Sequence, residues 1–125
     1  MQRVAFQIEF IFRASPTILY RFFTTPSCLV RWFCDGVDIV ADEFAFTWDG
    51  SEEMATLVDD IEDERVRFTW DEADEGEYFE FRMEVSPVTN ETILYVTDYC
   101  DEDEVDDQKK LWESQMEMLR RETGG

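Results

Sequence analysis

The chain has 125 residues, of which 44% are hydrophobic and 15% aromatic, enough to bury the core of one domain and to exclude intrinsic disorder. Eleven Lys and Arg residues against 31 Asp and Glu residues give a formal net charge of −20. Such a field repels phosphate backbones and anionic head groups, so we expect binding neither to nucleic acid nor to a membrane surface. The acidity favours a basic protein partner or an adaptation to high salt, and composition leaves both open.

Targeting segments and cysteine usage indicate the compartment. The N-terminus leads directly into an alternating strand, without the continuous apolar run of a signal peptide. No stretch of about 18 apolar residues is present, so we expect no membrane span. Cys28, Cys34 and Cys100 are odd in number and lack CxxC spacing, which is typical of reduced packing residues. We therefore expect a cytoplasmic protein.

The first third of the chain predicts one strand followed by two short helices. Apolar side chains alternate over residues 3–13, which is typical of a half-buried strand. The pairs Ser15-Pro16 and Thr25-Pro26 each place a capping residue before a proline at the first helical position. Apolar residues follow both pairs at helical spacing, and the second such run extends to Phe33.

From residue 37 to residue 99 the hydrophobic period is mostly two. Strands are expected near 37–41, 44–48, 53–61, 66–70, 79–85 and 92–99. Asp49-Gly50 predicts a hairpin turn because both residues tolerate a positive φ. Helices flanking an antiparallel meander indicate an α+β class: a curved sheet of about seven strands closed by a long helix, in a single domain over residues 1–125.

The last helix, expected from about Glu104 to Arg121, has an apolar stripe and a charged face. The stripe consists of Val105, Trp112, Met116 and Leu119, widened by Leu111 and Met118. The expected ion pairs on the charged face are Asp106 with Lys110 and Glu117 with Arg121. Two amides, Gln108 and Gln115, fall inside the apolar arc. Such a local inconsistency often marks a functional position.

Several chemistries are excluded or disfavoured by the residues present. The absence of histidine excludes Ser-His-Asp and Cys-His catalysis and any zinc site that uses imidazole. Asp101 and Asp103 begin the spacing of a calcium loop, but Val105 occupies the next ligand position. Among 31 acids some pair always suits glycoside chemistry, so that signal has no specificity. We expect no metal and no cofactor, and an enzyme is the least favoured class.

What remains is an aromatic inner surface. The residues expected between the sheet and the last helix are Trp48, Trp70, Phe79, Phe81, Trp112 and Met116. In one interpretation they form a packed core. In the other, one helix cannot fill a strongly curved sheet, and these residues line a ligand cavity in which Gln108 and Gln115 orient the ligand. The sequence leaves both interpretations open.

The order of elements resembles the START-like, or SRPBCC, helix-grip superfamily. The similarity lies in residues 25–33, in 44–48 (Phe-Ala-Phe-Thr-Trp), in 67–70 (Arg-Phe-Thr-Trp) and in 111–119. It is strongest to the Aha-type branch, related to the C-terminal domain of the activator of the heat-shock chaperone ATPase, and to acidic bacterial START-like proteins. The resemblance implies a cavity between the sheet and the last helix.

Two functions follow. The first is non-enzymatic binding of a small hydrophobic ligand, such as a lipid or a polyketide-like compound, by the residues named above. The second is a co-chaperone-like interaction module that presents its acidic surface to a basic protein. Fold resemblance alone does not choose between them.

Overall fold

The protein forms one seven-stranded antiparallel sheet with three helices, seen in a computed structural model that describes residues 2–125. The strand order is β1-β7-β6-β5-β4-β3-β2, so the last six strands form a meander and β1 joins it beside β7. The strands are β1 (Arg3–Phe12), β2 (Gly36–Val40), β3 (Glu43–Trp48), β4 (Ser51–Ile61), β5 (Arg65–Trp70), β6 (Phe79–Val85) and β7 (Thr92–Asp101). The predicted α+β helix-grip class is confirmed.

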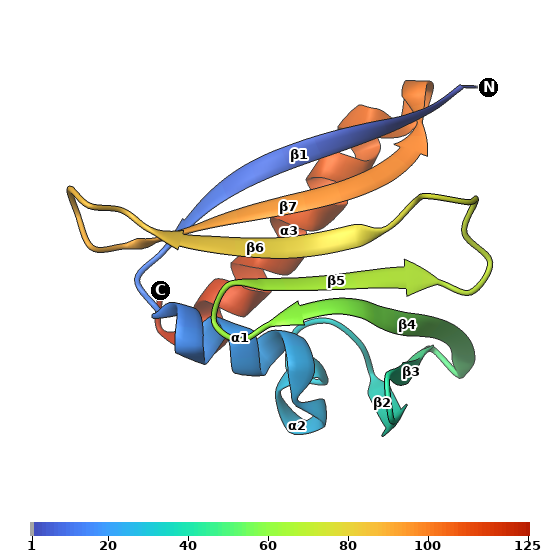
Figure 1. The fold of residues 1–125 in the computed structure, drawn as a ribbon, viewed down its shortest axis with the longest axis horizontal. Helices are drawn as coiled ribbons and strands as arrows, with labels where there is room; N and C mark the ends of the chain where they lie inside the picture. The colour runs from blue at the N-terminus through green and yellow to red at the C-terminus, as the bar shows by residue number, and fades with distance from the viewer. Residues whose placement is uncertain (1) are drawn as a thin grey trace.

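The helices lie on one face of this sheet, where α3 crosses the strands diagonally (Figure 1). Their bounds are α1 (Pro16–Thr24), α2 (Pro26–Leu29), the short 3-10 helix η1 (Glu102–Glu104) and α3 (Val105–Thr123). α1 packs against β5 and β6, whereas α3 packs against β1 and β7. The middle strands of the sheet are therefore covered by α1, and the strands at the β1 edge by α3.

Local sequence signals explain the main boundaries. The Ser15 hydroxyl accepts a hydrogen bond from the Ile18 amide at 3.3 Å and caps α1. Asp49 and Gly50 have φ values of 47° and 81°, which confirms the predicted hairpin turn between β3 and β4. Gly124, at φ 88°, ends α3 in the left-handed conformation that glycine adopts without strain.

The second helix and the first meander strand are shorter than predicted. α2 ends at Leu29 after a single turn, and Val30 is left exposed. Residues 30–33 continue as turns, which direct Trp32 and Phe33 into the core. Ala41, predicted to be in a strand, has a φ of 54° and lies in the turn after β2. Helical spacing over four apolar residues therefore overstated the length of the second helix.

On α3 the apolar stripe is narrower than predicted. Leu111 and Met118 are both exposed, so neither belongs to the buried stripe. Glu117 pairs with Arg120 at 2.6 Å, one position earlier than the predicted partner. Pairs three and four residues apart are both neighbours on a helix, and Arg120 also donates to a main-chain carbonyl of β1.

A fully buried part of the core lies where α1 and the C-terminal half of α3 meet the sheet. The ring of Phe23 stacks on that of Phe81, with centroids 4.2 Å apart and planes 6° apart. Met116 and Leu119 are fully buried in the same region. Complete burial of each such side chain contributes about 1.5–3 kcal/mol, so this end holds much of the stabilising apolar contact.

The cysteines are free thiols in the part of the chain that the structure describes. Cys34 and Cys100 are buried, and burial raises the pKa of Cys34 to about 11. Both therefore stay protonated at neutral pH, which suits packing residues better than ligands. Within residues 2–125, none of the helices is both long enough and apolar enough to cross a membrane.

Candidate functional site: a groove between the sheet and the N-terminal half of the last helix

Two connected hollows open between the sheet and the N-terminal half of α3. The aromatic hollow has a volume of about 250 Å³, and the acidic hollow, nearer the loop after β5, has about 540 Å³. Both are lined by Glu53, Trp70, Asp98 and Gln108. We call these four residues the throat and the two hollows together the groove. The combined space has the size of ordinary small-molecule sites.

Aromatic rings form the floor of the aromatic hollow. Trp70 at the end of β5 stacks on Phe79 of β6, with centroids 5.0 Å apart, and lies 6.1 Å from the ring of Trp48 on β3. The indole N–H of Trp48 donates to the main-chain carbonyl of Phe33 at 2.7 Å, which fixes the ring. Trp112 from α3 completes the floor, 6.4 Å from Phe79. These four strand and helix positions provide a rigid, mostly apolar surface.

Asp98 on β7 is the most constrained polar group at the throat. Its Oδ2 atom accepts from the Trp112 indole N–H at 3.0 Å, and its Oδ1 atom accepts from the Tyr99 amide at 2.8 Å. It makes no ion pair with any residue in 2–125. Burial raises the pKa of this carboxyl above its ordinary value, although the two hydrogen bonds oppose the shift.

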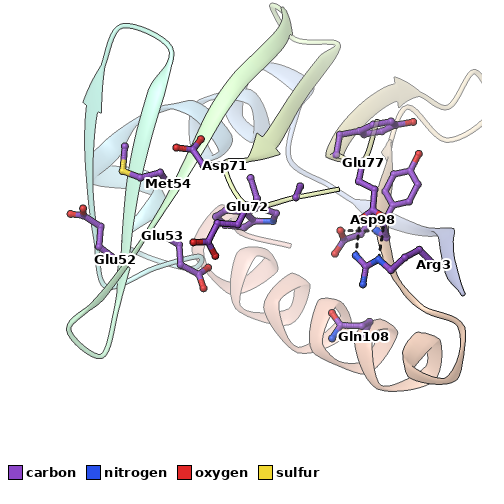
Figure 2. A pocket seen from close by; sticks show the side chains of 13 residues that line it. Arg3, Glu52, Glu53, Met54, Asp71, Glu72, Glu77, Asp98 and Gln108 are labelled. Carbon is purple, nitrogen blue, oxygen red and sulfur yellow. Dashed lines mark hydrogen bonds and ion pairs between the residues drawn. The ribbon is translucent and has the colours of Figure 1, made fainter. Parts of the chain in front are cut away.

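Carboxylates surround the acidic hollow. They come from β4, from the loop at 71–78 and from β7; Glu53 and Asp98 point toward the space above Gln108, whereas Glu52 points away from it (Figure 2). The acidic residues of this lining are Glu52, Glu53, Asp71, Glu72, Glu77 and Asp98. The potential inside the hollow is therefore strongly negative.

Within the described residues 2–125, Arg3 on β1 is the only cationic residue that lines either hollow. Its guanidinium pairs with Glu77 at 2.6 Å and with Asp101 at 3.4 Å, so it links β1 to the loop and to β7. Hydrogen bonding to Arg3 lowers the pKa of Glu77. Because these partners occupy Arg3, most of the remaining carboxylates of the groove have no basic neighbour to balance them.

The two amides of α3 both face the groove. Gln108 lines both hollows and is labelled on the helix in Figure 2, whereas Gln115 lines the aromatic hollow only. Both side chains are partly exposed. Neither makes a side-chain hydrogen bond to any residue in the described range, so both amides are available to a bound molecule.

The structure divides the predicted ligand-binding residues into two groups. Six of them line the groove: Trp48, Trp70, Phe79, Gln108, Trp112 and Gln115. Phe81 and Met116 do not line it, because Phe23 covers Phe81 and the sheet fully buries Met116. These two residues belong to the core, and binding by the other six stays a prediction.

Glu53 and Asp98 were missed, although a signal for each exists in the sequence. On β7, Leu94, Val96 and Cys100 are buried, and alternation places Asp98 on the same face. On β4, Glu53 follows the same alternation from the buried Ala55. The contribution of the loop at 71–78 has no such signal, because its position depends on the fold.

A cluster of carboxylates lies apart from the throat, at the start of η1. Asp101, Asp103 and Glu104 offer oxygen atoms within 4.8 Å of one another. Asp103 and Glu104 are exposed, and Asp101 already pairs with Arg3. Acids also gather at this position because the free amides of a helix N-terminus favour negative charge. The cluster alone does not indicate a metal centre.

Known structures share this architecture. A solution structure of the protein BfR322 from Bacteroides fragilis is 34% identical, with a TM-score of 0.72, covering 97% of this chain and 91% of that one. The Aha1 dimer from Colwellia psychrerythraea is 18% identical, with a TM-score of 0.81 and 96% of each chain covered. DynU16, a putative protein in the dynemicin biosynthetic locus, is 19% identical, with a TM-score of 0.77, covering 96% of this chain and 48% of that one.

The last two likenesses concern the fold alone. A search among curated proteins gives no significant match. The family model described as the START-like superfamily domain matches residues 1–125. Together with the 34% identity to the Bacteroides protein, this match shows that the chain belongs to the START-like superfamily.

Proposed function

We propose that this protein is a non-enzymatic, cytoplasmic binding module that holds a small, largely hydrophobic ligand in the groove. The observation that carries the proposal is the aromatic hollow, in which the indoles of Trp48, Trp70 and Trp112, packed around the buried Phe79, line a space next to two unbonded amides. Ligand sites generally combine such an apolar lining with a few polar groups that orient the ligand. Among the residues that line the groove, none pairs a hydroxyl or thiol nucleophile with a base, which supports binding rather than catalysis.

Trp48, Trp70 and Trp112 provide direct reporters for a test. Their indole N–H signals would shift in a ¹H–¹⁵N spectrum when an apolar compound is bound. Trp32 serves as an internal control, because its indole donates to the main-chain carbonyl of Phe22 inside the core at 2.9 Å. Decanol and related ten-carbon compounds, kept below their aggregation limits, are suitable probes.

The expected result is a saturable shift of the three groove signals with little change at Trp32. A matched variant, Trp70→Ala, should abolish saturation while retaining the dispersed spectrum of a folded protein. If every probe leaves the three signals in place, or shifts all four tryptophans together, the proposed function is overturned.

A second candidate is an interaction module for a basic protein, supported by the carboxylates around the acidic hollow. An interface of this kind forms by electrostatic attraction and weakens as salt screens the charges. Pull-downs from the host at low and at high salt test it. Recovery of the same proteins at both salt concentrations would contradict it.

A further inference from the structure

The charge distribution of the groove narrows the class of ligand. This inference rests on the proposed function and concerns the charge of the bound molecule. We infer that the ligand is an amphipathic cation, with an apolar body on the aromatic floor and an ammonium or guanidinium group at the throat beside Asp98 and Glu53.

Asp98 would lose its contact with water when a ligand binds. Both of its oxygens accept hydrogen bonds from neutral donors, and no cation among residues 2–125 pairs with it. A ligand that fills the aromatic hollow also covers the throat and removes water from this carboxylate. Covering a carboxylate without a counter-ion is unfavourable, whereas a cation placed beside it compensates the lost hydration.

Negative charges outnumber positive ones in the lining of the acidic hollow. Six acidic residues line the acidic hollow, whereas among residues 2–125 one basic residue lines it, Arg3, which is occupied by Glu77 and Asp101. An anionic head group, such as a fatty-acid carboxylate or a phosphate, would therefore be repelled. A neutral ligand would gain nothing from this field, whereas a cation would be attracted to it.

The tryptophan rings of the floor also favour a cation. Indole faces attract ammonium and guanidinium groups through the ring quadrupole, and tryptophan is the best of the aromatic side chains for this contact. Trp70 lines both hollows, so the same ring contacts an apolar body on one side of the throat and a charged group on the other. The free carbonyl oxygens of Gln108 and Gln115 can accept from the same cation.

The test compares three probes of equal chain length: decylammonium, decanol and decanoate. Each is titrated against the intact protein at low salt and neutral pH, and the indole signals of the three groove tryptophans are followed. Decylammonium should bind at least about tenfold more tightly than decanol, as charge-assisted hydrogen bonds suggest, and decanoate should bind most weakly.

Two variants test whether the carboxylates of Asp98 and Glu53 bind the ammonium group. Asp98→Asn keeps an acceptor for the Trp112 indole, and Glu53→Gln alters the opposite wall without touching that hydrogen bond. Each should weaken decylammonium binding by about tenfold and leave decanol binding unchanged or tighter. The matched control is Asp38→Asn, which removes the same charge from an exposed position on β2 that does not line the groove.

The pH dependence gives an independent readout. Decylammonium should bind more tightly as pH rises through the titration of Asp98, whereas decanol should bind less tightly, since covering an ionised carboxylate requires proton uptake. The groups that surround Asp98 are Arg3 on β1, Glu53 on β4, Glu77 in the loop, Tyr99 on β7, and the uncharged Gln108 and Trp112 on α3.

The outcomes are distinguishable. If none of the three probes shifts the groove signals, the proposed function fails. If decanol or decanoate binds as tightly as decylammonium, or if both variants retain full affinity for decylammonium, the proposed function stands and the cationic ligand is overturned.

Discussion

The two halves of α3 meet the same sheet in different ways. In the C-terminal half, Met116 and Leu119 are fully buried, whereas in the N-terminal half Leu111 is 57% exposed and Gln108 faces open space. The difference arises because α1 supplies Phe23 to fill the sheet at one end, and no helix does so at the other. One end of the domain therefore provides stability and the other provides a site.

The largest expected difference in stability between the two ends follows from removing an aromatic ring at each of them. Phe81→Ala, at the closed end, should lower the free energy of unfolding by about 3–5 kcal/mol, because it leaves a cavity beneath Phe23. Trp70→Ala, at the open end, should cost only about 1–2 kcal/mol, since the ring is half-buried. Urea denaturation measures both values, and equal losses would contradict the division.

A polar residue placed at the closed end and an apolar residue placed at the open end should affect stability very differently. Met116→Gln should destabilise the protein by about 2–4 kcal/mol, because it places an unpartnered amide in the packed core. Gln115→Leu, one residue earlier, should change stability by less than about 0.5 kcal/mol and alter the binding of ten-carbon probes instead. If Gln108→Leu and Gln115→Leu instead stabilise the protein strongly without affecting any probe, the groove is better described as an imperfect core.

The third prediction concerns pH and Asp98. Its pKa is raised in the folded state, so the folded protein holds this proton more tightly than the unfolded chain does, and the carboxyl destabilises the fold increasingly as pH rises through that raised pKa. Asp98→Asn removes this charge, but its single oxygen can serve only one of the two donors, Trp112 and Tyr99, so it should raise the melting temperature by at most about 2–4 °C at pH 7. The gain should shrink as pH falls toward the ordinary range of an aspartate.

Asp38→Asn again serves as the control for Asp98→Asn. It relieves the same amount of net charge but lies exposed on β2, outside the groove. An equal rise in melting temperature for both variants, at every pH, would show that general repulsion rather than burial is responsible.

A small effect on stability is also expected at the mouth of the groove. Arg3→Gln removes the pairs with Glu77 and Asp101 and should cost less than about 1 kcal/mol, because the guanidinium is 41% exposed. The loss should diminish further with added salt. Since Arg3 also favours the ionised form of Asp98, the same variant should raise the pKa of Asp98 further, which titration of its carboxyl signal would detect.

Periodicity predicted the fold well and the site in part. Alternation on β1 and the meander, and the proline-marked helix starts, depend on neighbours in the chain and are visible in the sequence. The separation of Phe79, which lines the groove, from Phe81, which does not, depends on Phe23 in another element. No local pattern contains that information. Asp98 was readable by alternation, but its importance appears only once Trp112 is placed beside it.

The partial burial of Asp98 makes proton uptake on ligand binding a measurable quantity in this protein. With no histidine in the chain, and with burial raising the pKa of the Cys34 and Cys100 thiols, few side chains exchange protons near neutrality. Calorimetric titrations in buffers of different ionisation enthalpy would therefore report on very few groups. Proton uptake with an uncharged ligand, and its absence with a cationic one, would record the ionisation of a single carboxyl as the groove fills.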